Sequence, residues 1–210
     1  MVRILLVDDH AVVRKGIRSI LEDGLPSAVI TEAGSGDEGL TTLGIQTFDA
    51  VVLDLSMPGR SGIDLLAEVK HRWPKLPVLI MSLHPEEHFA VRALRAGASG
   101  YLTKAAAPEA LIEAVQKVTR GGKYISEAVA DRLASELGKA APTSVPHDKL
   151  SDREFEVMRG IAAGESVSEI AARMHLSVKT VSTYRTRLLE KMGMTTNAEL
   201  TRYAIQNGLV

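Results

Sequence analysis

Short apolar runs alternate with segments of helical periodicity over the first 120 residues of the chain. The runs are rich in Val, Leu and Ile and lie at residues 4–7, 28–33, 50–53, 78–81 and 101–103. Such runs are typical of strands that are buried on both faces of a parallel sheet. Between them, apolar residues recur every three to four positions, which predicts amphipathic helices.

Prolines and glycines set the limits of the predicted helices. The first helix follows residue 10 and is broken at Pro26. The other four are expected over residues 36–44, 61–73, 85–95 and 108–120. Five β-α units in succession predict an α/β fold, in which helices cover both faces of a doubly wound, five-stranded parallel sheet with right-handed crossovers.

The pattern changes after residue 121. One further helix is expected over residues 126–137. Residues 138–149 then contain two prolines and almost no apolar periodicity, which is typical of an interdomain linker. From Leu150 onward the pattern is helical only. The sequence therefore predicts three parts: an α/β domain over 1–121, a helix and linker over 122–149, and a small all-α four-helix domain over 150–210.

Helix-start signals divide the last part of the chain. Ser151, Ser166 and Thr196 are each followed three positions later by Glu, which fits a capping box. A fourth helix is expected from Ser177 to about Met192, with Thr180 in place of the Glu. A carboxylate there would repel phosphate, whereas free N–H groups would attract it. Thr180 at this position therefore favours nucleic acid as a partner, although chance would also explain the absence of Glu.

Composition excludes several classes of protein. A chain of 210 residues is long enough for two modest domains. The absence of cysteine excludes disulfides, thiol catalysis and Cys-type zinc sites. No apolar run approaches membrane-spanning length, and the N-terminus does not resemble a signal peptide. We therefore expect a soluble cytoplasmic protein with no membrane partner, while the net charge of −1 decides nothing about nucleic acid.

Polar residues follow four of the predicted strands. Asp8 and Asp9 follow the first strand, Asp54 the third, Ser82 the fourth and Lys104 the fifth. The carboxyl ends of parallel strands meet at one edge of a doubly wound sheet, where such folds bind ligands. Each of these residues alone fits a helix cap or a surface group equally well. Together they predict a polar pocket at that edge.

The residue types in this pocket indicate phosphoryl transfer. Three carboxylates would raise one another's pKa unless a cation lies among them, and a few carboxylates with room for water suit Mg²⁺. Lys104 supplies a positive charge for an anion, and Ser82 supplies a hydroxyl. The set predicts that Asp54 is a nucleophilic carboxylate that accepts a phosphoryl group.

The sequence resembles the receiver domain of bacterial two-component response regulators. The resemblance lies in Val7-Asp8-Asp9-His10, in Leu53-Asp54-Leu55-Ser56-Met57-Pro58-Gly59 through Gly62, in Met81-Ser82, in Ala96-Gly97-Ala98 and in Tyr101-Leu102-Thr103-Lys104. It implies a flavodoxin-like sheet with the strand order 2-1-3-4-5. It also implies a sensor histidine kinase as the partner that phosphorylates the protein.

The resemblance assigns roles to the pocket residues. Asp54 is implied to be the phosphoacceptor, modified to 4-aspartylphosphate, with Lys104 beside it. Asp9 is implied to bind Mg²⁺ directly, together with Asp54 and the Ser56 carbonyl, and Asp8 beside it is implied to belong to the metal site through water. The protein is not expected to be an enzyme, because it takes part only in its own Mg²⁺-dependent aspartyl phosphorylation and dephosphorylation.

Three further residues, Ser82, Tyr101 and Ala105, bear on the conformational change that phosphorylation is expected to cause. The resemblance implies that Ser82 and Tyr101 form a pair that reorients after phosphorylation, with Tyr101 turning inward. The family usually has proline after the lysine, with a cis bond, whereas this chain has Ala105. A cis bond before a residue other than proline costs about 3 kcal/mol. The sequence leaves open whether this bond is cis or trans.

Residues 169–192 have the outline of a helix-turn-helix. The predicted core residues are Ile170, Met174, Leu176, Val181, Leu188 and Met192, with Tyr184 beside them. The residues left facing outward are Lys179, Ser182, Thr183, Thr186, Arg187 and Lys191. Five basic residues against one acidic residue over 173–191 favour DNA, although a solvated helix face would have the same charge.

Residues 150–210 closely resemble the LuxR-type domain of the NarL/FixJ family, and residues 181–185 are similar to the GacA-type global regulators within it. The matching stretches are Leu150-Ser151-x-Arg153-Glu154, Gly164-x-Ser166-x-x-Glu169-Ile170-Ala171, Leu176-Ser177-Val178-Lys179-Thr180-Val181 and Lys191-Met192-Gly193. The resemblance implies that Ser182, Thr183 and Thr186 face base edges of double-stranded DNA. Phosphate contacts are implied for Lys179, Arg187 and Lys191, and Thr180 belongs to the same contact surface.

The two resemblances together predict a DNA-binding transcriptional response regulator that is activated by phosphorylation of Asp54. RNA polymerase is an expected partner. A homodimer is expected on phosphorylation, because paired recognition helices match palindromic half-sites. The helix over residues 198–207 is either a dimer face or a helix that simply closes the core of the small domain.

Three alternatives remain. Residues 34–39 match the G-x-G-x-x-G fingerprint of dinucleotide-binding enzymes, but they follow the weak second strand, away from the expected crevice. His84 and His88 have the spacing of zinc ligands, without an evident third ligand. The third alternative is a regulator that binds DNA without ever accepting phosphate.

Overall fold

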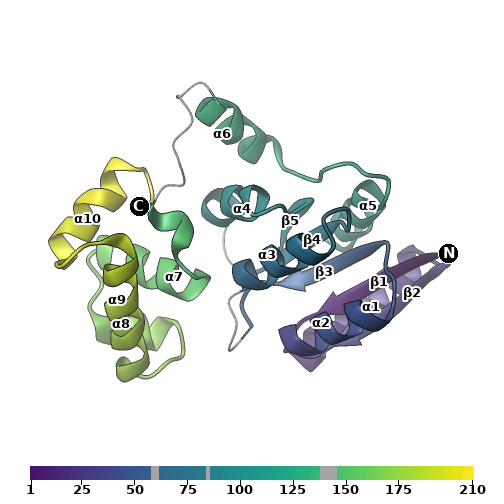
Figure 1. Cartoon of the computed structure of the whole chain (residues 1–210), viewed down its shortest axis with the longest axis horizontal. Coiled ribbons are helices and arrows are strands. Elements are labelled where there is room, and N and C mark those ends of the chain that lie inside the picture. The colour runs from purple at the N-terminus through teal and green to yellow at the C-terminus, as the bar shows by residue number, and fades with distance from the viewer. Residues whose placement is uncertain (58–61, 84–85, 138–145) are drawn as a thin grey trace. The chain divides into compact units, whose positions relative to one another are not determined.

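The protein is described by a computed structural model that covers residues 1–57, 62–83, 86–137 and 146–210. The chain divides into two compact units, residues 1–141 and 142–210, and each is described by itself (Figure 1). The predicted division into 1–121, 122–149 and 150–210 stays a prediction.

The first unit contains one all-parallel sheet of five strands. The strands are β1 Val2–Val7, β2 Ala28–Ala33, β3 Ala50–Asp54, β4 Val78–Ser82 and β5 Gly100–Thr103. Their order is β2-β1-β3-β4-β5, as predicted. Every residue of β3 and β4 is buried, which explains why these strands are apolar up to their last residues, Asp54 and Ser82. The prediction of a flavodoxin-like α/β fold is confirmed.

Helices cover the two faces of this sheet, as Figure 1 shows. They are α1 Ala11–Gly24, α2 Gly36–Ile45, α3 Gly62–Arg72, α4 Glu86–Arg95 and α5 Pro108–Thr119. Helix α1 packs against α5, and α2 packs against α3. Ile17 and Leu21 of α1 and Leu111 and Val115 of α5 join the sheet residues in one apolar cluster. The core thus packs the strands against the helices and leaves their carboxyl ends for polar side chains.

A last segment of the first unit continues beyond the predicted α/β domain. Tyr124 forms a parallel bridge with Gly100, next to β5, and helix α6 Glu127–Leu137 packs against α4. The predicted helix over 126–137 is therefore present. Residues 138–145 of the predicted linker lie outside the described residues.

The second unit is helical. It contains a 3₁₀ turn, Pro146–Lys149, and the helices α7 Asp152–Ala162, α8 Val167–Arg173, α9 Val178–Met192 and α10 Asn197–Gln206. Helices α7, α8 and α10 each begin with a capping box in which the cap side chain and the Glu bond reciprocally. Helix α9 is capped by Ser177 alone and has no acidic residue in its first turn. All four predicted helix starts are therefore present.

The predicted core of this unit is nearly right. Buried side chains are Ile170, Met174, Val181, Leu188 and Met192. Leu176 and Tyr184 are only half-buried. The turn between α8 and α9 contains His175 with φ of 53°, a left-handed conformation that residues other than glycine rarely adopt. Helix α9 ends at Gly193, whose φ of 64° gives the usual left-handed cap.

Candidate functional site

The polar strand ends of the first unit meet at one edge of the sheet, as predicted. Asp54 is the last residue of β3, Asp8 directly follows β1, and Lys104 directly follows β5. Strands β1 and β3 are neighbours in the sheet although β2 lies between them in the sequence. The edge between them is therefore the topological switch point, where open α/β sheets bind ligands.

Lys104 joins the two most buried carboxylates of this edge. Its Nζ lies 2.6 Å from Asp8 Oδ2 and 2.7 Å from Asp54 Oδ2. The side chains of Asp8 and Asp54 are each 1% exposed, and that of Lys104 is 7% exposed. The remaining carboxylate oxygens accept backbone N–H groups, of His10 at 2.7 Å and of Ser56 at 2.9 Å. The pocket therefore satisfies four carboxylate oxygens with one ammonium and two amides.

The charges of this pocket are strongly coupled. Burial raises the pKa of the Asp54 carboxyl, while Lys104 and the Ser56 amide oppose that rise and Asp8 adds to it. Burial lowers the pKa of the Lys104 ammonium, but Asp54 and Asp8 outweigh it, so that the net shift of this pKa is upward. The site is thus short of positive charge, because one ammonium faces two buried carboxylates.

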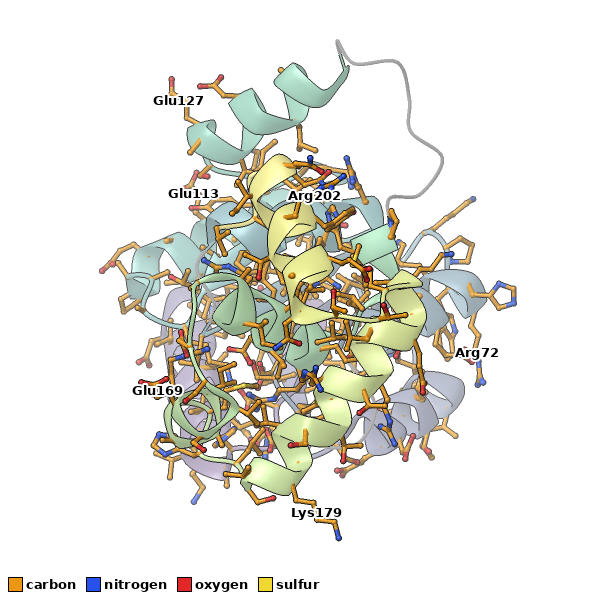
Figure 2. All side chains as sticks on the ribbon, turned by 90° about the vertical axis from the view of Figure 1, so that its left-hand side faces the viewer. Arg72, Glu113, Glu127, Glu169, Lys179 and Arg202 are labelled. Carbon is orange, nitrogen blue, oxygen red and sulfur yellow. The ribbon has the colours of Figure 1, made fainter. Side chains whose placement is uncertain are left out.

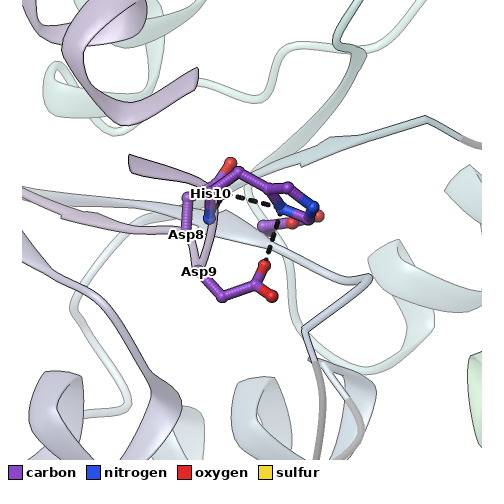
Figure 3. A group of neighbouring side chains, drawn as sticks. Asp8, Asp9 and His10 are labelled. Atoms are coloured by element: carbon purple, nitrogen blue, oxygen red, sulfur yellow. Dashed lines mark hydrogen bonds and ion pairs between the residues drawn. The ribbon is translucent and has the colours of Figure 1, made fainter. Parts of the chain in front are cut away.

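Asp9 lies beside this ion pair, and its side chain is 24% exposed. Its Oδ1 is buried and lies 2.8 Å from Nδ1 of His10, but it accepts no well-aligned hydrogen bond among the described residues. Ligand atoms of Asp8, Asp9, His10 and Asp54 all lie within 4.8 Å of one another. Figure 3 shows the first three of these residues. A carboxylate oxygen without a well-aligned hydrogen bond, close to ligand atoms of three other residues, fits a divalent cation. The residues present therefore suit a metal site.

The predicted switch residues lie next to the pocket. Ser82 is fully buried at the end of β4, and its carbonyl accepts the backbone N–H of Lys104 at 2.7 Å. Tyr101 in β5 is also fully buried. The inward turn of Tyr101 that the sequence analysis expects after phosphorylation stays a prediction. The Lys104–Ala105 bond is trans, since the described part of the chain contains no cis peptide bond.

The helix-turn-helix of the second unit presents a polar surface. The exposed residues of α9 are Lys179, Ser182, Thr183, Thr186, Arg187 and Lys191, whereas Thr180 is half-buried. Figure 2 shows Lys179 pointing away from the unit at the N-terminal end of α9. The hydroxyls of Thr183 and Thr186 donate to helix carbonyls four positions earlier, at 3.0 Å and 3.1 Å. Their oxygens are left to accept further hydrogen bonds.

Lys191 has a structural partner that the sequence analysis missed. Its Nζ lies 2.7 Å from Oε2 of Glu154, whose side chain is almost fully buried. The same oxygen accepts the Ser151 N–H of the α7 capping box at 2.8 Å. Lys191 therefore also ties α9 to α7, a pairing that sequence spacing alone does not show.

Comparison with known proteins agrees with this geometry. Residues 4–116 match the response regulator receiver domain, and residues 148–204 match the LuxR family of bacterial regulatory proteins. The chain belongs to the NarL/FixJ family of response regulators.

Relatives of this response regulator align along its whole length. The response regulator UvrY of Escherichia coli K12 is 36% identical over 209 residues, which cover 100% of this chain and 96% of UvrY. The response regulator GacA of Pseudomonas aeruginosa is 35% identical, covering 100% of this chain and 98% of GacA. The predicted similarity to the GacA type is therefore confirmed.

A solved structure of the RcsB response regulator of Salmonella typhimurium has a TM-score of 0.58 and 28% identity, covering 96% of this chain and 97% of RcsB. A second structure holds two RcsB dimers bound to two parallel DNAs, with a TM-score of 0.59 and 27% identity, covering 96% and 97% of the two chains. The response regulator thus has a receiver domain and a LuxR-type DNA-binding domain, and the family regulates transcription rather than catalysing metabolic reactions.

The dinucleotide-binding and zinc-binding alternatives gain no support from the structure of this response regulator. The glycines of 34–39 follow β2 at the outer edge of the sheet, and Ser35 and Glu38 cap α2 there. That position is not the crevice of a dinucleotide-binding fold. The zinc hypothesis for His84 and His88 rests on side chains outside the described residues. No helix in the described residues is long and apolar enough to span a membrane.

Proposed function

We propose that this response regulator accepts a phosphoryl group on Asp54 from a sensor histidine kinase and thereby controls transcription. The observation that carries the proposal is the pocket at the carboxyl edge of the sheet. There, Asp54 is buried, ion-paired with Lys104 and adjacent to Asp8 and Asp9. A buried carboxylate of raised pKa is a stronger nucleophile than one in water.

The chemistry follows from these contacts. An Asp54 carboxylate oxygen attacks phosphorus, and the bond from phosphorus to the donor nitrogen or oxygen breaks, with its electron pair leaving on the donor. Lys104 stays near the new oxygens and neutralises their charge. Asp9, Asp54 and the Ser56 carbonyl would hold Mg²⁺, with Asp8 adjacent. The ion would supply further positive charge to the transferring group.

Ser82 and Tyr101 are proposed to transmit the modification. The Ser82 hydroxyl, at the end of β4, is placed to donate to a phosphoryl oxygen on Asp54, because these two strands are neighbours. Tyr101 on β5 would reorient together with Ser82 and turn inward. The surface of α4 and α5 then repacks and favours a homodimer.

The DNA contacts are proposed for one face of α9. Ser182, Thr183 and Thr186 would face base edges, while Lys179, Arg187 and Lys191 would contact phosphates, with Thr180 at the helix start. Small hydroxyl side chains discriminate weakly, so DNA shape would contribute to specificity. The dimers of RcsB on DNA support a dimeric complex, in which RNA polymerase is the further partner.

The test is DNA binding to a promoter pool, with and without a small-molecule phosphodonor and Mg²⁺. We expect the phosphodonor to tighten binding of the natural protein. Asp54→Asn should abolish both the phosphorylation of the protein by the phosphodonor and the tightening of DNA binding. Asp23→Asn, a change of the same kind at an exposed position of α1, should keep both.

Two results would contradict the proposal. Labelling that persists in Asp54→Asn would show that another residue is the nucleophile. Equal DNA binding with and without phosphodonor would favour the phosphorylation-independent regulator, in which the helical unit binds DNA and the acidic pocket has no regulatory role.

A further inference from the structure

His10 directs its ring toward the acidic cluster instead of capping a helix. It is the N-cap residue of α1, yet its side chain makes no capping hydrogen bond. Serine, threonine, aspartate and asparagine are preferred at this position because they do make that bond. The ring is turned instead toward Asp8 and Asp9, as Figure 3 shows. The ring position thus needs a reason other than helix capping.

The distances around His10 are those of neighbouring metal ligands. Its Nδ1 lies 2.8 Å from Asp9 Oδ1 and 3.5 Å from Asp8 Oδ1. The shorter distance is within ion-pair range and is marked in Figure 3, although Asp9 Oδ1 accepts no well-aligned hydrogen bond in the described part of the chain. Adjacent ligands of an octahedral ion with bonds of about 2.1 Å are separated by about 3 Å. The spacing of the two atoms, which fits a direct pair, also fits two ligands that share one cation.

We propose that Nδ1 of His10 is an additional ligand of the receiver's cation site and makes this site prefer first-row transition metals, such as Mn²⁺ and Co²⁺, over Mg²⁺. The inference rests on the cation site of the proposed function and adds its metal preference. Imidazole nitrogen suits the transition metals, whereas Mg²⁺ strongly prefers oxygen and water. The His10 side chain is 56% exposed, so an ion can reach it from solvent.

Metal affinity of the full-length protein tests this preference. Calorimetric titrations with Mg²⁺ and with Co²⁺ are compared for the natural protein, His10→Ala and Asp9→Asn. We expect His10→Ala to weaken Co²⁺ binding about tenfold or more and to leave Mg²⁺ binding unchanged. Asp9→Asn should weaken both metals. His71→Ala, at an exposed histidine at the end of α3, should change neither.

A spectroscopic measurement tests the ligand directly. Pulsed EPR of bound Mn²⁺ should show coupling to an imidazole nitrogen in the natural protein and in His71→Ala. The coupling should disappear in His10→Ala. Coupling that persists in His10→Ala, or that is absent from the natural protein, would overturn the proposal.

The titrations separate three outcomes. An equal loss of both metals in His10→Ala would mean that His10 only positions Asp9, and would overturn the inference while leaving the proposed function intact. Unchanged binding of both metals would also overturn it. If Asp9→Asn changes neither metal, the cation site of the proposed function itself is wrong, a result independent of phosphodonor labelling at Asp54.

Discussion

Lys104 is the residue on which the acidic pocket depends most. It is the only ammonium that the described residues place within ion-pair distance of Asp8 and Asp54. Removing one partner of a buried ion pair leaves an uncompensated buried charge, which costs more than the pair itself contributes. Lys104 is therefore expected to stabilise the folded receiver by compensating these carboxylates, independently of any role in phosphoryl transfer.

Replacing Lys104 by the uncharged methionine should destabilise the receiver by about 3 kcal/mol or more at neutral pH. The loss should be smaller at about pH 5 than at about pH 7. The pKa of Asp54 is already raised above its ordinary 3.8, and losing the ammonium raises it further. For a carboxyl with a raised folded pKa, stability falls as pH rises from the unfolded pKa to the folded pKa.

Urea unfolding of Lys104→Met at the two pH values measures this difference. Lys15→Met, at an exposed position of α1, is the control and should lose little at either pH. If the Lys104 variant were equally destabilised at both pH values, the carboxylates would not be the cause.

His175 carries backbone strain in the helix-turn-helix. Its φ of 53° is left-handed, which costs a residue with a Cβ about 1–2 kcal/mol. His175→Gly should raise the free energy of unfolding of the second unit by roughly 0.5–1 kcal/mol, after allowing for the greater chain entropy of glycine. His175→Val should lower it, because a branched Cβ fits this region least. Circular dichroism during urea unfolding would measure the free energy of unfolding of both variants. A glycine variant less stable than the natural protein would show that the backbone of His175 is not strained.

At the scale of the element, α9 combines a surface for DNA with an anchor to α7. Lys179 belongs to the surface, since it is exposed at the first turn of the helix. Lys191 belongs partly to the anchor through Glu154. The two lysines should therefore respond differently to the same substitution.

Lys179→Ala should weaken DNA binding about equally for all sequences. It should also reduce the slope of log affinity against log salt by about one. The reason is that one phosphate contact fewer releases one counterion fewer. Fluorescence anisotropy over a salt series measures the slope. As a control, the thermal unfolding of Lys179→Ala should match that of the natural protein. An unchanged slope would remove Lys179 from the phosphate contacts.

Lys191→Ala should weaken DNA binding and also destabilise the second unit by roughly 1–3 kcal/mol. The buried Glu154 carboxylate would retain the Ser151 N–H but lose its charged partner. Glu154→Gln in the same background should recover part of the stability without recovering DNA affinity. If Lys191→Ala unfolds like the natural protein, the ion pair contributes nothing to the anchor.

At the scale of the whole molecule, the two units have separate cores and separate proposed functions, phosphorylation in the first and DNA binding in the second. The second unit has its own buried residues, capping boxes and recognition surface. A fragment of residues 142–210 should therefore fold and bind DNA by itself. Its binding should not respond to phosphodonor, in contrast to the full chain. Gel-shift titrations of both proteins test this, and a fragment that responds to phosphodonor would place the phosphoacceptor outside the receiver.

Several features of this protein follow from the sequence alone, because they depend on local rules. Apolar runs bounded by glycine and proline identified the five strands, and the capping boxes located three helices of the second unit. The position of Asp54 at a strand end also followed, since it comes directly after the apolar run at residues 50–53. These inferences need only neighbours in the chain.

Other features were decided by the tertiary structure, because they join residues far apart in the sequence. Lys104 bridges Asp8 and Asp54 across 96 and 50 positions, and Lys191 reaches Glu154 across 37. His10 follows Asp9 directly, yet only the backbone turn before α1 directs its ring toward the carboxylate. Side-chain direction and long-range pairing arise from packing, which no local pattern encodes. The sequence therefore determined which groups reach the edge of the sheet, and the fold decided which of them meet.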